Sequence, residues 1–184
     1  MNKRNSHNLL SATTAIRNRQ AGFTLIEVLV SVIILSIGLV GVAGLQAISL
    51  KNNQSAFMRS QATALAYDMA DRMRSNVLSG TTGLYDPTAA ATTSGCTSTS
   101  GCSEQQMAEN DLAEWNAAIT TYLPMGQGYV CVDSTPNDGT GFGDPQCDGN
   151  GTGLAVKIWW DDDRDGVINM TSTNTERLAI TVQL

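Results

Sequence analysis

The chain has 184 residues, 42% of them hydrophobic and 15% charged, and its 11 Lys and Arg against 17 Asp and Glu give a net charge of -6. This length allows one domain with an appendage. The acidic balance argues against nucleic acid as the main partner, because phosphate binding needs a basic patch. The only histidine is His7. Once residues 1–22 are removed, a histidine-containing catalytic triad and a histidine-ligated zinc site are therefore excluded.

The N-terminus combines a short basic segment with a long apolar run. Residues 1–22 carry four bases and no acid, and residues 23–50 contain a single ionisable side chain, Glu27. As a helix these 28 residues would span ~42 Å, whereas a bilayer core needs only about 20 residues. The basic flank predicts a cytoplasmic N-terminus and an exported C-terminal part.

Three interpretations of this region compete. It could be a plain membrane anchor, or a signal peptide that is cut after the apolar run. The third possibility is cleavage between Gly22 and Phe23, which leaves the apolar helix in the mature protein. A carboxylate within a spanning helix costs about 2.5–3.5 kcal/mol and is usually there for a partner. Glu27 therefore favours the third interpretation.

Residues 21–30, AGFTLIEVLV, resemble the processing and methylation motif of type IV prepilins and type II secretion pseudopilins. Gly22, Phe23 and Glu27 match that motif position by position. The resemblance implies cleavage after Gly22 by prepilin peptidase and N-methylation of the Phe23 amine. It also implies an assembly role for Glu27, whose carboxylate would neutralise the terminal amine of a neighbouring subunit. A buried charge is tolerable when it is paired in this way.

The helix is expected to continue beyond the membrane to about residue 77. One apolar stripe, typical of a helix face packed on a sheet, is formed by Met58, Ala62, Leu65, Met69, Met73 and Val77. On the polar face, Asp68 can pair with Arg72 at i, i+4, and Asp71 with Arg74 at i, i+3. Residues 23–77 are therefore predicted to form a single helix.

Two further segments narrow the resemblance to one group of pilins. Residues 65–76, and the run from Leu112 to Pro124, resemble the PilV-type minor pilins, which are type IV pilus modification proteins. Together with the N-terminal motif, they imply an α+β fold of the type IV pilin kind. In that fold a long N-terminal spine helix packs on a small antiparallel β-sheet accompanied by a second short helix.

The same resemblance implies a division of the chain into a leader, two helix halves and a head. These parts are a cleaved basic leader at 1–22, a transmembrane half of the spine helix at 23–50, a soluble half at 51–77 and an exported globular head at 78–184.

The head is expected to begin with an irregular loop and a second helix. Residues 79–103 are rich in Ser, Thr, Gly and Ala and bury little. Ser103 followed by Gln106 suits a capping box, and Pro124 ends an amphipathic stretch over 104–122. The acids of this helix are expected to form a solvated face: Glu104, Glu109, Asp111 and Glu114.

Three strands are predicted after this helix. Residues 129–132 form a short strand. In residues 154–160 and 178–184, a large apolar side chain stands at every second position. Alternation with period two predicts one buried face for each strand. Because loops join the strands, we expect an antiparallel sheet packed on the long helix.

The four cysteines lie beyond the membrane helix, where an oxidising compartment favours disulfides. Three connectivities are possible. Cys96–Cys102 and Cys131–Cys147 are favoured because each pair brackets a flexible loop. Closing a loop of about 15 residues contributes ~3 kcal/mol in the chain-entropy model. A zinc site made of all four cysteines is the rival, but the spacings do not suit one.

An acidic run has two interpretations. Asp161, Asp163 and Asp165, followed by Gly166, match the start of a calcium loop, but Ser172 stands where the bidentate Glu belongs. The alternative is a solvated turn between two strands, with Asp-Gly as the turn chemistry. The weak calcium interpretation is the only cofactor that the sequence suggests.

The resemblance implies a minor pilin that primes type IV pilus assembly in the bacterial inner membrane and ends at or near the pilus tip. Its partners would be prepilin peptidase, other minor pilins, the major pilin, a large tip adhesin and the inner-membrane assembly platform. The main alternative is a minor pseudopilin of a type II secretion system. A DNA receptor is disfavoured because residues 75–184 hold 14 acids and three bases, a charge that repels DNA. No enzyme is expected, since neither Lys51 nor Lys157 accompanies a matching serine motif.

Overall fold

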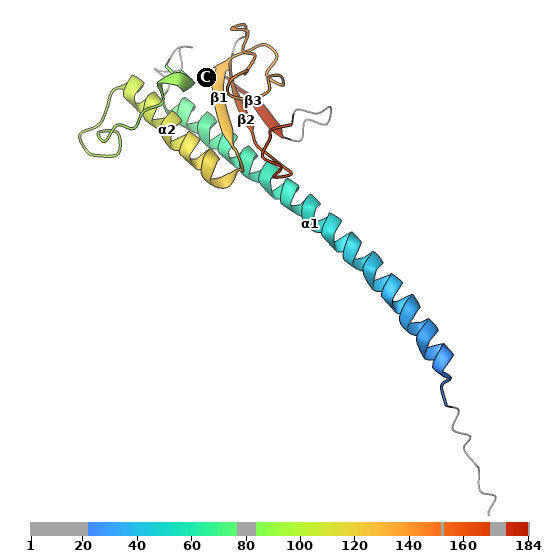
Figure 1. Cartoon of the computed structure of the whole chain (residues 1–184). Coiled ribbons are helices and arrows are strands. Elements are labelled where there is room, and N and C mark those ends of the chain that lie inside the picture. Colours follow the sequence, from blue (N-terminus) through green and yellow to red (C-terminus); the bar gives the residue numbers. More distant parts are fainter. Residues whose placement is uncertain (1–21, 77–83, 152, 170–175, 184) are drawn as a thin grey trace, which may run out of the picture. The chain divides into compact units, whose positions relative to one another are not determined.

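The computed structural model describes residues 22–76, 84–151, 153–169 and 176–183 (Figure 1). The predicted leader, apart from Gly22, lies outside these residues. Six elements follow one another along the chain: α1 (Leu25–Ser75), the 3-10 helix η2 (Pro87–Ala89), α2 (Glu104–Tyr122), β1 (Gln127–Val132), β2 (Leu154–Trp159) and β3 (Arg177–Val182). The chain divides into two units, Met1–Gln46 and Ala47–Leu184. Each unit is described by itself below.

Helix α1 confirms the predicted long helix with slightly shorter bounds. It begins at Leu25 instead of residue 23, and the Thr24 carbonyl accepts hydrogen bonds from the amides of Glu27 (3.1 Å) and Val28 (3.3 Å). It ends at Ser75, and the last predicted position of the stripe, Val77, lies outside the described residues.

In the second unit, α1 buries the predicted apolar stripe. Met58 is 3% exposed, Ala62, Met69 and Met73 are fully buried, and Leu65 is 8% exposed. These side chains share one hydrophobic core with residues of α2 and of the sheet, including Leu112, Trp115, Val130, Val156 and Ile158.

The predicted ion pairs on the polar face of α1 also form. Arg72 Nε lies 3.0 Å from Asp68 Oδ2, and Arg74 Nη1 lies 3.0 Å from Asp71 Oδ1.

The sheet has three antiparallel strands in the order β1-β2-β3. Val130 of β1 stands opposite Val156 of β2, which stands opposite Ile180 of β3. Val156 and its neighbour Ile158 are buried in the core that also contains the methionines of α1. The α+β fold expected from the sequence is therefore confirmed.

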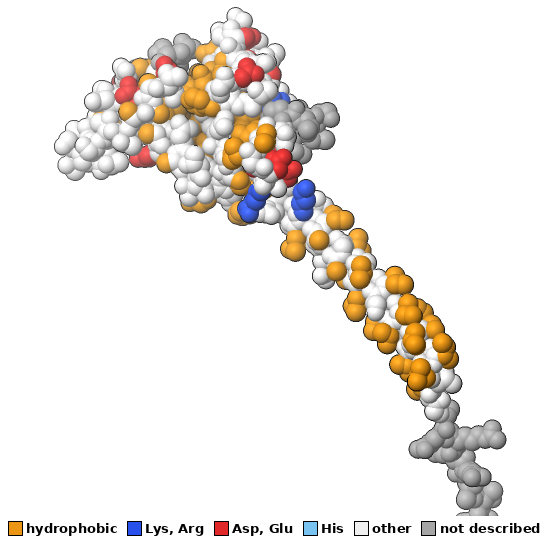
Figure 2. Space-filling view, in the orientation of Figure 1, with side chains coloured by type: hydrophobic (Ala, Val, Ile, Leu, Met, Phe, Trp, Pro, Cys, Tyr) orange, Lys and Arg blue, Asp and Glu red, His pale blue; other side chains and the backbone are white. Residues whose placement is uncertain are grey.

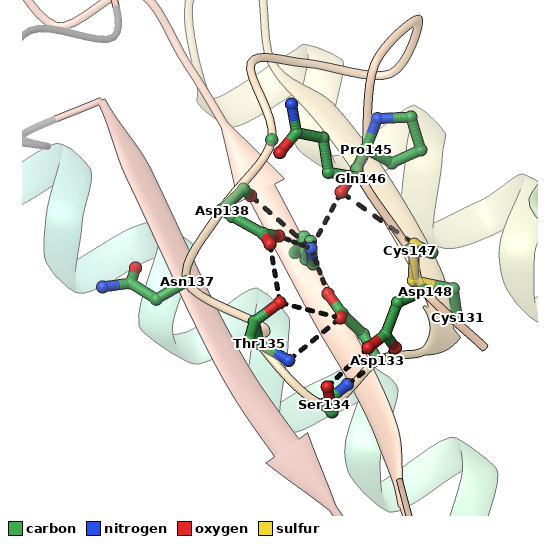
Figure 3. A network of polar contacts seen from close by, with 12 residues as sticks. Cys131, Asp133, Ser134, Thr135, Asn137, Asp138, Pro145, Gln146, Cys147 and Asp148 are labelled. Carbon is green, nitrogen blue, oxygen red and sulfur yellow. Dashed lines mark hydrogen bonds and ion pairs between the residues drawn. A yellow bond between two sulfur atoms is a disulfide. The ribbon is translucent and has the colours of Figure 1, made fainter. Parts of the chain in front are cut away.

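Strand β2 corrects the prediction that each strand has one buried face. All six of its residues are buried, and Ala155, Lys157 and Trp159, on the face opposite the helices, are fully buried. The segment that follows β1 folds back over this face (Figure 3), and the end of the Lys157 side chain contacts Asp133, Asp138 and the Pro145 carbonyl of that segment.

Helix α2 has the predicted bounds and the predicted start. The Ser103 hydroxyl accepts from the amide of Gln106, and the Gln106 side chain accepts from the amide of Ser103, which completes a capping box. The predicted solvated acidic face is wrong at one position, because Asp111 is only 7% exposed. Its carboxylate turns toward Arg72 of α1, which supplies the positive charge that makes its burial tolerable.

Candidate functional site

The head of α1 brings together the residues that the sequence singles out for processing and assembly. Gly22 and Phe23 immediately precede the helix, and Phe23 is 81% exposed. Glu27 lies in the first turn, where the helix dipole favours a negative charge. Its main-chain carbonyl accepts from the Ser31 hydroxyl at 2.7 Å. Within residues 22–76, the part of the chain around it that the structure describes, no ion pair engages its carboxylate.

The first part of α1 is apolar on all sides. Hydrophobic side chains lie along the face that Figure 2 shows, and the exposed ones around the helix include Leu25, Ile26, Ile34, Leu35, Ile37, Leu39, Val40 and Leu45. Among the described residues, α1 is the helix that is long and apolar enough to cross a membrane. Apolar surface of this extent requires lipid or neighbouring helices to cover it.

Arg72 joins the second half of α1 to α2. Its Nη1 lies 3.1 Å from Asp111 Oδ1 and 2.9 Å from Glu114 Oε2. The Tyr85 hydroxyl donates to the other oxygen of Asp111 at 3.1 Å. Hydrogen bonds from Arg72 and then from Asn110 hold the pKa of Glu114 below its ordinary value. This cluster fixes the acidic side of α2 against the long helix.

Two disulfides close the loops of the head. Cys96 is bonded to Cys102, and Cys131 is bonded to Cys147, the same pairs that the sequence favours. The second bridge joins β1 to the far end of the segment 133–147, which is called the covering loop below. Gly139 lies in this loop with φ +83°, a conformation that suits glycine.

Donors from β2 and β3 hold the covering loop to the sheet. Lys157 Nζ is in ionic contact with Asp133, lies 2.6 Å from Asp138 Oδ1 and donates to the Pro145 carbonyl at 2.8 Å (Figure 3). Arg177 donates to the Gly139 carbonyl at 2.7 Å.

Sequence reasoning did not anticipate these roles. The one available signal was a lysine in the middle of an otherwise apolar strand, which requires a buried acid once both faces of that strand are covered.

The acidic run after β2 is arranged around Asp161, which is 2% exposed. Its two carboxylate oxygens accept from the amides of Arg164 (2.7 Å) and Gly166 (2.8 Å). Asp161 and Asp163 come close to Glu176, with one carboxylate oxygen from each residue within 4.8 Å of the others.

Two further positions bear on the calcium interpretation. Asp165 does not join this group; it accepts from the amide of Val167 at 2.8 Å and from the Asn169 side chain at 2.9 Å. Ser172 lies outside the described residues. Glu176 was not considered from the sequence because it lies four residues beyond the position expected for a calcium ligand. The turn and the calcium loop both stay predictions.

Two family models match consecutive parts of the chain. Residues 17–43 match the prokaryotic N-terminal methylation motif, and residues 44–113 match the family described as type IV pilin Tt1218. Together they cover more than half of the 184 residues. The first match includes Gly22, Phe23 and Glu27, and the second includes the buried stripe of α1 and the first part of α2. No curated protein and no solved structure matches the chain.

Proposed function

Because the chain belongs to the type IV pilins, we propose that it is a minor pilin that primes pilus assembly in the inner membrane and is incorporated at or near the pilus tip. Pilins are structural proteins, so its action is association with other subunits, and it needs no cofactor for that. The minor pseudopilin of a type II secretion system is the alternative, since it uses the same N-terminal motif.

The observation that carries this proposal is the position of Glu27 at the head of an exposed apolar helix. The first turn of α1 offers a carboxylate, and Phe23 would carry the new terminal amine after cleavage. Glu27 lies four positions after Phe23, so one subunit displaced along a bundle axis can present its amine to the acid of the next. Pairing of the two charges in an apolar surrounding stabilises the bundle, whereas an unpaired Glu27 opposes it.

Processing by prepilin peptidase follows from the N-terminal methylation motif, and we propose that the cut lies between Gly22 and Phe23. The proposed location is the inner membrane, with a cytoplasmic N-terminus and a periplasmic head, before transfer to the pilus. The basic residues ahead of the apolar run support this orientation. The two disulfides support an oxidising compartment for the head.

The proposed partners are other minor pilins, the major pilin, a large tip adhesin and the inner-membrane assembly platform. The resemblance of residues 65–76 and 112–124 to PilV-type minor pilins supports this set. The structure gives these segments a shared role within the subunit, since Arg72 and Trp115 bind across from one helix to the other.

A deletion strain tests the proposal against its alternative. Removal of the gene is expected to reduce surface pili strongly and to leave type II secretion of exoproteins unchanged, and the wild-type chain restores piliation. Loss of exoprotein secretion with normal piliation would assign the protein to the type II secretion system instead of the pilus. The mature protein from sheared pili is expected to begin with N-methylated Phe23, as read by intact mass and N-terminal sequencing. A start at Met1 would overturn the pilin pathway altogether.

A further inference from the structure

Lys157 and Asp133 form a charge pair that is wholly buried beneath the covering loop. The side chains of both residues are 0% exposed. Lys157 lies in the middle of β2, and Asp133 directly follows the last residue of β1. The neighbouring Cys131–Cys147 bridge ties the Asp133 segment to the far end of the loop (Figure 3). The two groups are therefore confined to one another by the strands and by the disulfide.

The two oxygens of Asp133 have different surroundings. Oδ1 accepts from the amide of Thr135 at 3.0 Å. The Thr135 hydroxyl lies 3.4 Å from this oxygen but only 2.7 Å from Asp138 Oδ2, to which it donates. Oδ2 is in ionic contact with Lys157 Nζ, yet within the described residues it has no hydrogen-bond partner. The nitrogen thus meets the carboxyl group outside the geometry of a hydrogen bond. Oδ1 is held by a main-chain amide, a donor of the kind that stabilises a developing oxyanion.

Amide formation needs an amine in contact with a carboxylic acid. A buried ion pair carries a large desolvation penalty unless hydrogen bonds satisfy both ions, and here one carboxylate oxygen has none. Transfer of one proton from Lys157 Nζ to Asp133 Oδ2 removes both charges. It leaves an amine in contact with a carboxylic acid, which are the two reactants of a condensation.

We propose that Lys157 and Asp133 become joined by an intramolecular amide bond. The neutral Nζ attacks Cγ of Asp133, so that an N–C bond forms and charge develops on Oδ1, which the Thr135 amide holds. The Cγ–Oδ2 bond then breaks, and Oδ2 leaves as water with two protons that both came from Nζ. One ammonium and one carboxylate thus give one amide and one water, with no change of oxidation state. The remaining amide hydrogen keeps the 2.8 Å contact with the Pro145 carbonyl.

Asp138 is the group that can move the second proton. Its Oδ1 lies 2.6 Å from Lys157 Nζ, and its Oδ2 accepts from the Thr135 hydroxyl at 2.7 Å. Burial opposes its charged form, but hydrogen bonds from Lys157 and Thr135 outweigh that effect and lower its pKa. It is therefore ionised and can accept a proton from the attacking nitrogen. Its side chain is 32% exposed, which gives the water produced a route to solvent.

The bond is independent of the proposed function, since it concerns only the interior of the head. It predicts one chemical change in the chain purified from membranes in detergent, namely a mass lower by one water molecule. Digestion with trypsin shows where in the sequence the bond lies. Between Arg74 and Arg164 the only tryptic site is Lys157, and an acylated lysine is not cut. The denatured, reduced and alkylated chain is expected to yield the fragment 75–164, uncut at Lys157 and lighter by one water.

Two variants separate this bond from other dehydrations. Among the Asp-Gly pairs of the chain, Asp138-Gly139 and Asp148-Gly149 lie in this fragment, and they can lose water as cyclic imides without involving Lys157. Lys157→Arg keeps the charge but removes the amine. Trypsin cuts this variant after position 157, so the expected products are the fragments 75–157 and 158–164, both at full mass. Asp138→Asn keeps both reactants and is expected to lower the linked fraction at least tenfold shortly after synthesis.

The tryptic fragments of the wild-type chain test the amide bond even if a variant fails to fold. Release of an unmodified fragment 75–157 from the wild-type chain would overturn the proposal. So would a water loss that persists in Lys157→Arg, because that loss would be an imide.

Discussion

The indole Nε1 of Trp115 donates a 2.8 Å hydrogen bond to the main-chain carbonyl of Leu65, fifty residues earlier in the chain. Trp115 is fully buried on α2, and Leu65 lies on the buried stripe of α1. The bond ties a ring atom of α2 to one main-chain carbonyl of α1 and so helps to fix the register between the two helices.

Substitution of this tryptophan is expected to destabilise the protein in two steps. Trp115→Phe removes the hydrogen bond and should lower the free energy of unfolding by about 1 kcal/mol. Trp115→Ala also leaves a cavity and should lower it by about 3–5 kcal/mol. Urea unfolding followed by circular dichroism measures both values. Tyr122→Phe, at an exposed position of the same helix, should stay within about 0.5 kcal/mol of the wild type. Equal losses in all three variants would contradict the assigned role of the ring.

Two arginines of α1 provide a matched pair for testing buried charge. Arg72 pairs with Asp111, whose side chain is 10% exposed, whereas Arg74 pairs with Asp71, which is 76% exposed. Arg72→Met leaves the carboxylate of Asp111 without its positively charged partner and should lower the free energy of unfolding by about 1–3 kcal/mol. Arg74→Met breaks only a surface pair and should cost less than about 1 kcal/mol. Thermal unfolding of both variants gives the comparison, and a larger loss for Arg74→Met would show that the buried pair was misjudged.

Glu27→Gln tests the assembly role directly. The amide cannot neutralise an ammonium, so incorporation into pili should fall about tenfold or more, equivalent to at least ~1.4 kcal/mol. Cleavage should continue, since the Gly22–Phe23 bond is untouched. The amounts of processed protein in membranes and in sheared pili measure the two effects separately. Ser31→Ala is the control, because its hydroxyl is bound within its own helix. Normal incorporation of the Gln variant would remove the carboxylate from the mechanism.

The covering loop has a backbone position that tolerates only glycine. A Cβ at Gly139 would lie 2.6 Å from the Pro145 carbonyl oxygen, and the backbone there has φ +83°. Gly139→Ala should therefore lower stability by at least about 1–2 kcal/mol, the cost of the left-handed conformation alone. Gly143→Ala, in the same loop with no atom within 4 Å of the added carbon, should leave stability nearly unchanged. Urea midpoints of the two variants check the contrast, and identical midpoints would mean that the loop shifts without penalty.

Glu176 predicts an unusual pH dependence. Burial raises its pKa above the ordinary 4.5, and the neighbouring charges of Asp163 and Asp161 add to the effect. A raised carboxyl pKa means that the folded state binds a proton more tightly than the unfolded state does. This contribution is complete below pH 4.5 and is lost as the pH rises through the folded-state pKa. Glu176→Gln should thus be more stable than the wild type at pH 7, and the difference should vanish near pH 4.5.

Melting temperatures measured across this pH range test the prediction, and a difference that does not change with pH would contradict it. Adding calcium at pH 7 separates the two interpretations of the acidic run. The turn predicts no effect on either protein, whereas the calcium loop predicts a rise in melting temperature that is larger for the wild type.

The parts of the fold that the sequence predicts well are those set by local signals. The bounds of α2 follow from the capping box at Ser103 and Gln106 and from Pro124. The buried face of α1 follows from helical spacing alone. The disulfide pairing follows from short, flexible loops between neighbouring cysteines. In each case the determining residues lie within about one element of one another, so no tertiary knowledge is needed.

The residues that escaped prediction depend on contacts between distant segments. Alternation in β2 indicates one buried face, but it contains no information about the loop that covers the other face. Lys157 and Asp133 are 24 positions apart, and their pairing depends on that cover. Asp111 fits an exposed helix face by spacing, yet Arg72 lies directly across from it. Glu176 approaches Asp161 only because β2 and β3 are antiparallel neighbours.

In the covering loop, the main chain makes contacts that hold the head together, whereas many side chains only form its surface. Apart from the carboxylates of Asp133 and Asp138, Lys157 and Arg177 hold the loop through main-chain carbonyls, at Pro145 and Gly139. A main-chain carbonyl is present whatever the side chain of its residue, so most positions of the loop can be substituted while these hydrogen bonds persist. Substitutions in this loop can therefore change the surface of the head while the sheet beneath it keeps its fold.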